Sequence, residues 1–373
     1  MRGVWVSLLL CAICLSTSGC AVNGEVENQA YALVMGVDAA DDGIVLTIRI
    51  PRIGQGGQGD EKSGGKGEPY LVISAEGTDY AQAMENLQWA VARELNLSHL
   101  KLLVVSEALA SGESFPGILR QIARTRHLYT TAGFIVCEGG ARDFIEGQQT
   151  LLGSHLSDDI EATFRHYAAH SFIPKATFAD LYYDTMSCYS DPVGIWGFPD
   201  PGEKSAAAVI ESDPGRLNAG TRTASSRQYL GTVLFRGGRM VGRLDAAETL
   251  GLNLLTGKVN SFTFESNGRA WDLSSLRGPK VRVDTRGDRP SVCVDIYLTS
   301  ARQEGLAALE TAISEDLMLL VEKCRRMGVE PFGFAEKAAK HFAALQEWLE
   351  YDWHSRFQQA EVEVVTHISG PDH

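Results

Sequence analysis

Apolar and polar positions alternate along the first half of the chain in a way that predicts strands and helices in turn. Residues 31–51 combine an apolar run, an Asp-Asp-Gly turn and an alternating segment ending at Pro51, which predicts a β-hairpin. Short apolar runs predict further strands over 71–75, 100–106 and 129–137. Apolar residues at helical spacing predict helices over 79–95, 115–126, 158–169 and 177–186. This alternation indicates helices packed on a sheet.

A second series of elements begins at residue 229. A hairpin is predicted over 229–244, turning at Arg236-Gly237-Gly238, and Asp245 with Glu248 has the spacing of a capping box that begins a short helix. Further strands are predicted over 259–264, 280–284, 292–298 and 361–368. Two amphipathic helices are predicted over 304–327 and 341–357.

Composition shifts divide the chain into parts. Residues 54–68 contain no apolar side chain and predict a solvated loop, and the stretch rich in Pro, Gly, Ser and Thr before residue 228 predicts a linker. We therefore expect an α+β protein of two or three domains, each packing helices on a mostly antiparallel or mixed sheet. The predicted parts are an N-terminal α/β region over 28–200, either one domain or two that divide near 146, a linker over 201–227 and a C-terminal domain over 228–370.

The first nineteen residues have the layout of an export signal. Arg2 is their only charge, and a twelve-residue apolar run over 4–15 precedes Ser-Thr-Ser-Gly-Cys. Because a permanent membrane helix needs about 20 apolar residues, this run predicts a cleaved lipoprotein signal peptide over 1–19 and a tether over 20–27.

Small residues before Cys20 resemble a bacterial lipobox, in which the cysteine receives a diacylglyceryl thioether and becomes the new N-terminus. Ser18 and Gly19 fit this pattern, whereas Thr17 stands where Leu is usual. The alternative is an ordinary secreted protein cut near Gly19, with Cys20 as a free or paired thiol.

Charge limits the partners. The chain has 373 residues, of which 44% are hydrophobic and 22% charged, an ordinary globular composition. Its 47 acidic and 34 basic residues give a formal charge of −13, which argues against nucleic acid as a partner. An anionic membrane surface would repel the chain too, so attachment to a membrane requires something other than a basic patch, such as lipid.

Candidate chemistry is sparse. His166 and His170 lie four residues apart, but a zinc-protease helix needs Glu where Tyr167 stands, so no metal site is predicted. A serine-hydrolase turn around Ser114 fails because Pro116 stands where Gly is required. Cysteines after residue 20 are far apart and predict single buried thiols: Cys137, Cys188, Cys293 and Cys324.

Two acidic and aromatic features have structural explanations. Glu248 could act as a general acid or base, but its capping-box position accounts for it. Trp348 and Trp353, with Tyr351 between them, could form an aromatic ligand platform or an interface, but the helical spacing of Phe342, Trp348 and Leu349 favours a place in the core. No catalytic residue, cofactor site or ligand contact is therefore assigned.

The order of features over the whole chain resembles the Ger(x)C family of spore-germination lipoproteins. It is carried by MGVDAADDGIVLTIRIP at 35–51, SAEGTDYAQAMENL at 74–87, SHLKLLVVSEALA at 98–110, the segment from GTVLFRGGRMVGRL to LLTGKV at 231–259, and PFGF at 331–334. The long helix after Glu304 and the closing strand complete the succession. Each motif alone is common to many folds.

This resemblance implies a non-catalytic subunit of a membrane nutrient receptor that triggers spore germination. Cys20 would carry S-diacylglycerol and an N-acyl chain such as palmitate, holding the protein at the outer face of the spore inner membrane, a cell membrane. Its partners would be the membrane-embedded A-type and B-type receptor subunits. A second hypothesis is a solute-binding lipoprotein of a transporter, which predicts a ligand cleft between two lobes. A third, an exported hydrolase, lacks a catalytic constellation.

Overall fold

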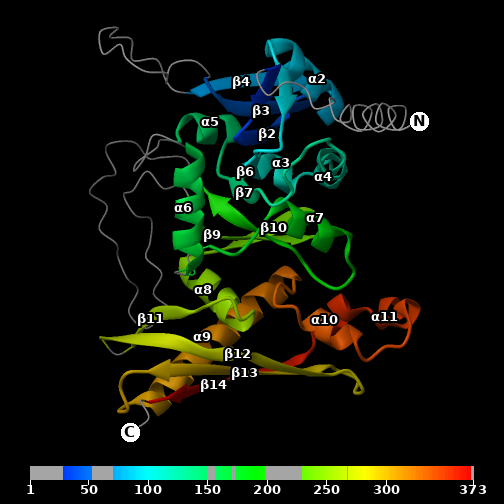
Figure 1. Cartoon of the computed structure of the whole chain (residues 1–373). Helices are drawn as coiled ribbons and strands as arrows, with labels where there is room; N and C mark the ends of the chain where they lie inside the picture. Colours follow the sequence, from blue (N-terminus) through cyan, green and yellow to red (C-terminus); the bar gives the residue numbers. More distant parts are fainter. Residues whose placement is uncertain are drawn as a thin grey trace, which may run out of the picture.

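The computed structural model describes residues 28–52, 70–148, 156–169, 171, 173–198, 229–266 and 268–370. The predicted signal peptide over 1–19, the tether with Cys20, the loop over 54–68 and the linker over 201–227 lie outside these residues. Figure 1 shows two sheets lying one above the other, with helices on and between them.

The first sheet has eight strands in the order β10-β9-β8-β7-β6-β2-β3-β4. Its four central strands are parallel neighbours, and antiparallel hairpins extend it on both sides. The strands are β2 (Val34–Ala40), β3 (Gly43–Pro51), β4 (Tyr70–Gly77), β6 (Leu102–Ser106), β7 (Gly133–Cys137), β8 (Val193–Gly197), β9 (Tyr229–Arg236) and β10 (Arg239–Leu244).

Helices cover both faces of this sheet, which explains the unbroken apolar runs of its parallel strands. Leu103 faces one core together with Phe115, whereas its neighbour Leu102 faces another core together with Phe144. The helices are α2 (Tyr80–Ala90), α3 (Glu107–Ser111), α4 (Phe115–Ala123), α5 (Ala141–Glu146), α6 (Leu156–Ala169) and α7 (Phe178–Met186). Beside them, β1 (Gln29–Tyr31) and β5 (Glu94–Asn96) form a separate parallel pair.

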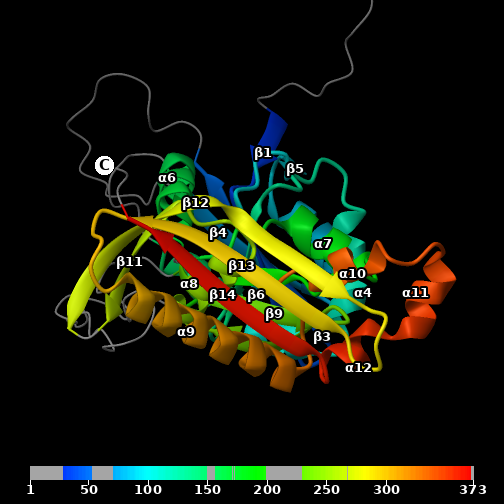
Figure 2. The same ribbon diagram turned by 90° about the horizontal axis from the view of Figure 1, so that it is seen from below.

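The second sheet has four strands in the order β11-β12-β13-β14, with β14 parallel to β13. The strands are β11 (Ser261–Ser266), β12 (Arg269–Asp284), β13 (Ser291–Ser300) and β14 (Glu361–Ser369). Alternate residues face a core that includes the buried stripe of α9 (Leu306–Met327). Figure 2, seen from below, shows β12, β13 and β14 side by side with α9 running along them.

Shorter helices complete the part of the chain from residue 246 onward, which we call the second half; the residues before it form the first half. The chain passes from the first sheet to the second through α8 (Ala246–Leu255), and α10 (Phe334–Ala339), α11 (Leu345–Tyr351) and α12 (Trp353–Phe357) precede the last strand. Asp245 caps α8 as predicted, since its side chain accepts from the Glu248 N–H and the Glu248 side chain accepts from the Asp245 N–H. The mixed sheets with packed helices confirm the predicted α+β class.

Several predicted bounds were wrong. The single helix expected over 341–357 is two short helices after a non-helical stretch, because Asp352 takes a left-handed conformation with φ 49° and interrupts the turn. The helix expected to reach residue 95 ends at Ala90, since residues 94–96 pair with β1 instead. The strand expected over 280–284 begins at Arg269, because pairing with both neighbours extends it. Strand β7 begins at Gly133 rather than at residue 129.

The strands on either side of residues 201–227 are antiparallel neighbours in one sheet, β8 and β9. Strands before and after residue 146, β7 and β8, are neighbours in that sheet too. The predicted domain boundaries at 146, 200 and 228 therefore remain predictions. The chain passes from the first sheet to the second through α8.

Candidate functional site

The described residues bring the two sheets together at a buried junction, which we take as the candidate site. The segment before β8 carries Cys188, Tyr189 and Asp191 and lies against the elements that follow α9. Trp348 in α11 donates its indole N–H to the Cys188 carbonyl at 3.1 Å, and its ring stacks on Tyr189 with centroids 6.0 Å apart. A side chain from the second half thus holds the backbone of the first.

The aromatic residues at this junction belong to the core. Trp348 is 4% exposed and Trp353 is 3% exposed, and their rings stack with centroids 6.0 Å apart. Phe342 packs edge-on against Trp348 at 5.5 Å. The prediction of a core position is confirmed for Trp348 and Trp353, whose rings are too buried to form a ligand platform, but it is wrong for Leu349, which is 51% exposed on the outer side of α11.

A buried carboxyl lies next to this cluster. Glu330, in the connection between α9 and α10, is 1% exposed. Its Oε1 accepts hydrogen bonds from the backbone N–H groups of Phe332 at 2.8 Å and Phe334 at 3.1 Å, and its Oε2 accepts from that of Ala335 at 2.7 Å. The side chain therefore satisfies donors that the beginning of α10 would otherwise leave unpaired.

A second carboxyl reaches Glu330 from the first sheet. Asp191 Oδ2 accepts from the Glu330 backbone N–H at 2.8 Å and lies 3.6 Å from Nδ1 of His354 in α12. Nearby, Arg236 at the end of β9 donates from Nη1 to the Gly328 carbonyl at 2.6 Å. Two side chains from the first sheet thus bind the backbone on either side of Val329.

Burial makes this junction sensitive to protons. It raises the pKa of Glu330 to about 8, against the three N–H donors that favour the carboxylate, and the neighbouring Asp191 charge adds to the rise. Burial also raises the pKa of Asp191, opposed by His354, by the Glu330 N–H and by Arg236. The carboxyl of Glu330, which is buried where the two halves meet, can therefore take up or release a proton.

Helix α8 makes a further polar contact between the halves. Asn253 donates from Nδ2 to the carbonyls of Ile173 at 3.2 Å and Ser171 at 3.4 Å. Glu248 Oε2 lies 2.5 Å from Nζ of Lys323 in α9, so its carboxylate is used in the cap and in this ion pair. The capping explanation of Glu248 is confirmed.

A cavity of about 330 Å³ opens on the first half, beside α6. Its polar lining includes Lys101, which pairs with Glu161 of α6, and Lys175, and Tyr129 and Phe164 add aromatic surface. Every lining residue lies between 101 and 195, so the cavity belongs to the first half alone. It is not a cleft between two lobes.

The histidine and serine motifs lie on or next to helices that cover the first sheet. His166 is exposed on α6, and His170 lies outside the described residues. Ser114 precedes α4, which Phe115 and Pro116 begin. Within the described ranges, no three His, Cys, Asp or Glu side chains gather closely enough to hold a metal ion. No helix among those residues is both long and apolar enough to cross a membrane.

The four described cysteines are unpaired. Cys137 and Cys324 are buried, and burial raises the pKa of each thiol well above its usual range. Cys188 and Cys293 are only half-buried, so the prediction of buried thiols holds for two of the four.

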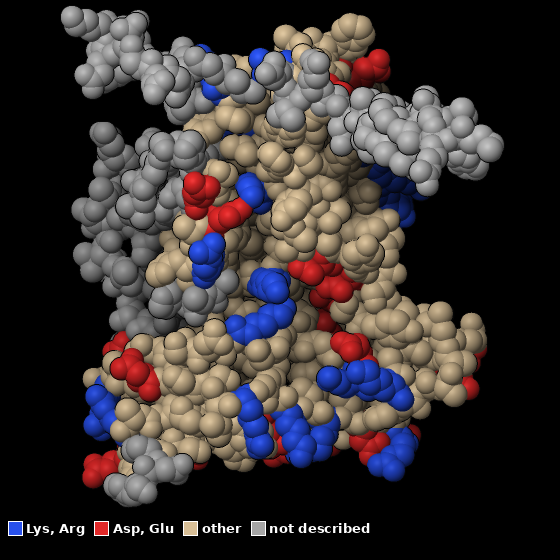
Figure 3. Space-filling view, in the orientation of Figure 1, with Lys and Arg blue, Asp and Glu red and all other residues tan. Residues whose placement is uncertain are grey.

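Figure 3 shows basic and acidic side chains interspersed over the lower half of one face of the molecule, in keeping with the mixed composition.

Sequence reasoning missed Asp191 and Glu330. The available signal was a charged residue between apolar ones, since Glu330 stands between Val329 and the PFGF motif that begins at Pro331. A glutamate in such a setting is rarely buried without partners. The partners of its side chain are backbone N–H groups two to five residues further on, but Asp191, which accepts from its backbone N–H, lies 139 positions away, and local patterns do not reveal that contact.

Comparison with known proteins agrees with this architecture. Residues 23–193 match a family described as "Spore germination protein N-terminal domain", and residues 230–369 match "Spore germination B3/ GerAC like, C-terminal". The chain is similar to the "Putative spore germination protein YfkR" of Bacillus subtilis (strain 168), with 21% identity over 98% of this chain and 95% of the relative.

Two further proteins are similar over most of their length. The "Spore germination protein KC" of the same organism is 23% identical, over 94% of this chain and 90% of the relative. The crystal structure of the GerBC protein has the same fold, with a TM-score of 0.51 and 13% identity over 90% of this chain and 96% of that chain. The resemblance drawn from the sequence is confirmed: the chain belongs to the Ger(x)C family of spore germination proteins.

Proposed function

We propose that this protein is the non-catalytic, lipid-anchored C-type subunit of a membrane nutrient receptor that triggers spore germination. The observation that carries the proposal is the match of both germination domains, in order, to residues 23–193 and 230–369. The curated relatives, one of them named a spore germination protein and the other a putative one, extend over nearly the whole chain.

The anchor would be Cys20, carrying S-diacylglycerol and an N-acyl chain. A single acyl chain gives only marginal membrane binding, whereas a diacylglyceryl group supplies two chains. This would offset the formal charge of −13, which disfavours an anionic surface. The protein would then lie at the outer face of the spore inner membrane, beside A-type and B-type membrane-embedded subunits.

The role of the folded part would be that of a scaffold. The junction of Asp191, Glu330 and Trp348 supports this, because contacts from both halves are buried there. A scaffold whose halves are fixed to each other can present surfaces from both sheets to neighbouring subunits in one orientation.

The test is affinity purification of the tagged full-length protein from detergent-solubilised spore membranes, with mass spectrometry of the co-purifying proteins and of the N-terminal peptide. We expect multi-span membrane proteins and a diacylated Cys20 in the wild type. The variant Cys20→Ser should lose the lipid and leave the membrane fraction. An unacylated protein recovered alone from the soluble fraction would refute the proposal and would favour a solute-binding role.

A further inference from the structure

Trp89, near the end of α2, is exposed in a way that no other described tryptophan is. Its side chain is 82% exposed. The remaining four described tryptophans are buried, with exposures of 7% or less: Trp196, Trp271, Trp348 and Trp353. Ala90 and Ala92 beside it are exposed as well, so the helix ends in an apolar corner. We call Trp89, Ala90 and Ala92 the Trp89 corner.

Hydrogen bonds fix this corner to the part of the chain that follows Cys20. Gln88 donates from Nε2 to the Arg93 carbonyl at 2.9 Å and accepts from the Leu95 N–H at 2.8 Å. These bonds hold the end of α2 against β5. In turn β5 pairs with β1, with Glu94 opposite Gln29.

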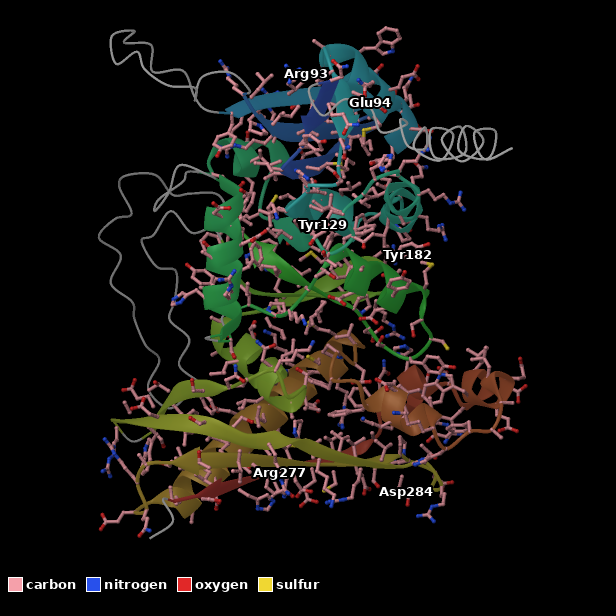
Figure 4. The ribbon with its side chains drawn as sticks, in the orientation of Figure 1. Arg93, Glu94, Tyr129, Tyr182, Arg277 and Asp284 are labelled. Atoms are coloured by element: carbon pink, nitrogen blue, oxygen red, sulfur yellow. The ribbon has the colours of Figure 1, made fainter. Side chains whose placement is uncertain are left out.

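The chain length limits how far this corner can lie from a lipid on Cys20. Gln29 follows Cys20 by nine residues, which span at most about 32 Å when fully extended. Trp89 precedes Glu94, the partner of Gln29, by five residues, or at most about 18 Å. Figure 4 shows Arg93 and Glu94 at one end of the molecule and Arg277 and Asp284 at the other. A lipid on Cys20 can therefore lie no more than about 32 Å from Gln29, which pairs with Glu94 at the same end of the molecule as the Trp89 corner.

We propose that the Trp89 corner rests in the headgroup region of the lipid bilayer and sets the orientation of the whole protein on the membrane. This inference depends on the proposed lipid anchor at Cys20. Tryptophan is enriched at membrane interfaces because its ring is apolar and its N–H is polar. Glu85 and Glu94 are exposed in the same region, so the surface that fits is zwitterionic rather than anionic.

The experiment uses the acylated full-length protein reconstituted into phosphatidylcholine vesicles with brominated acyl chains, which quench tryptophan fluorescence at short range. Trp89 is one of five tryptophans after residue 20, so contact should remove about one fifth of the emission if the rings emit equally. In Trp89→Phe this loss should disappear, while the thermal unfolding midpoint should stay the same because the side chain is exposed.

A matched control moves the probe to α9, the helix that packs on the second sheet. Leu319 on α9 is 65% exposed, and Leu319→Trp in the Trp89→Phe background should be quenched by aqueous iodide but not by brominated lipid. Protein that floats with vesicles while Trp89 remains unquenched, or while both positions are quenched equally, overturns this inference and leaves the anchor intact. If the wild-type full-length protein isolated from spores carries no acyl group on Cys20 and does not float with vesicles, the anchor and the inference are overturned together.

Discussion

The two sheets differ in how many of their faces are covered. In the first sheet, neighbouring residues of one strand, such as Leu102 and Leu103, are both fully buried because helices lie on both faces. In the second sheet, β13 alternates between the core residues Val292, Val294 and Ile296 and residues on the opposite face. Apolar runs therefore mark a two-sided sheet, and alternation marks a one-sided sheet.

The open face of the second sheet is a set of paired polar groups. Asp295 lies 2.8 Å from Arg282 and 3.2 Å from His367, and the His367 bond, followed by Arg282, lowers the pKa of Asp295. Tyr297 stacks on His367 with centroids 5.1 Å apart and has the guanidinium of Arg277 3.6 Å from its ring centre. Exposing these paired polar groups to water costs little free energy, whereas the apolar faces of the first sheet need helices to cover them.

The largest expected effect comes from deleting a ring between the first sheet and its helices. Phe134 in β7 is fully buried and contacts the rings of Phe115 and Phe235. Phe134→Ala should lower the free energy of unfolding by about 3–5 kcal/mol, because it removes apolar contact and leaves a cavity. Urea unfolding followed by circular dichroism measures this change.

Its counterpart on the open face is Tyr297→Ala. This change removes a stacking partner of His367 but leaves no closed cavity, so we expect a loss of at most about 1 kcal/mol. Equal losses at Phe134 and Tyr297 would contradict the contrast between a two-sided and a one-sided sheet.

A further effect, which depends on pH, is expected at the junction between the sheets. Because the pKa of Glu330 is raised from 4.5 to about 8, the folded protein holds a proton that the unfolded chain releases. The stability linked to this group is therefore complete below pH 4.5 and is lost as the pH rises through about 8. Unfolding midpoints measured across this range should fall for the wild type.

Glu330→Gln should flatten this slope, because the amide does not titrate. Glu336→Gln is the matched control, since Glu336 is exposed on the neighbouring α10, where it pairs with Lys340 at 3.2 Å. Asp191 next to Glu330, and His354 and Arg236 next to Asp191, are unchanged in both variants. A slope that is the same in wild type and Glu330→Gln would rule out this group as the cause.

The smallest expected effects come from removing a helix cap. They should be equal in the two regions, because a cap acts only on the end of its own helix. Thr177 caps α7 on the first sheet and Asp245 caps α8, each in a complete capping box. Replacing either residue with Ala should cost about 1 kcal/mol of unfolding free energy. Thermal unfolding of Thr177→Ala and Asp245→Ala measures both, and a loss much larger at one cap would mean that the sheets differ in more than their faces.

Local patterns in the sequence predicted most elements that rely on neighbouring residues. The stripe from Leu309 to Cys324 predicted α9 within two residues, and the Asp245 and Glu248 spacing predicted the cap of α8. Helix 341–357 failed because its apolar spacing gave no sign of the left-handed Asp352. Strand β8 was missed because it is only five residues long and two of those residues are glycines.

The amino-acid order was enough to predict the α+β class, the family resemblance and the burial of Trp348 and Trp353, since periodicity and residue order are local properties. The folded structure was needed to show that β8 pairs with β9, on the far side of residues 201–227, and that Asp191 contacts Glu330. Such pairings depend on which distant surfaces bury each other. A buried carboxyl and its partner leave no shared period in the sequence, so their contact emerges only when the chain folds.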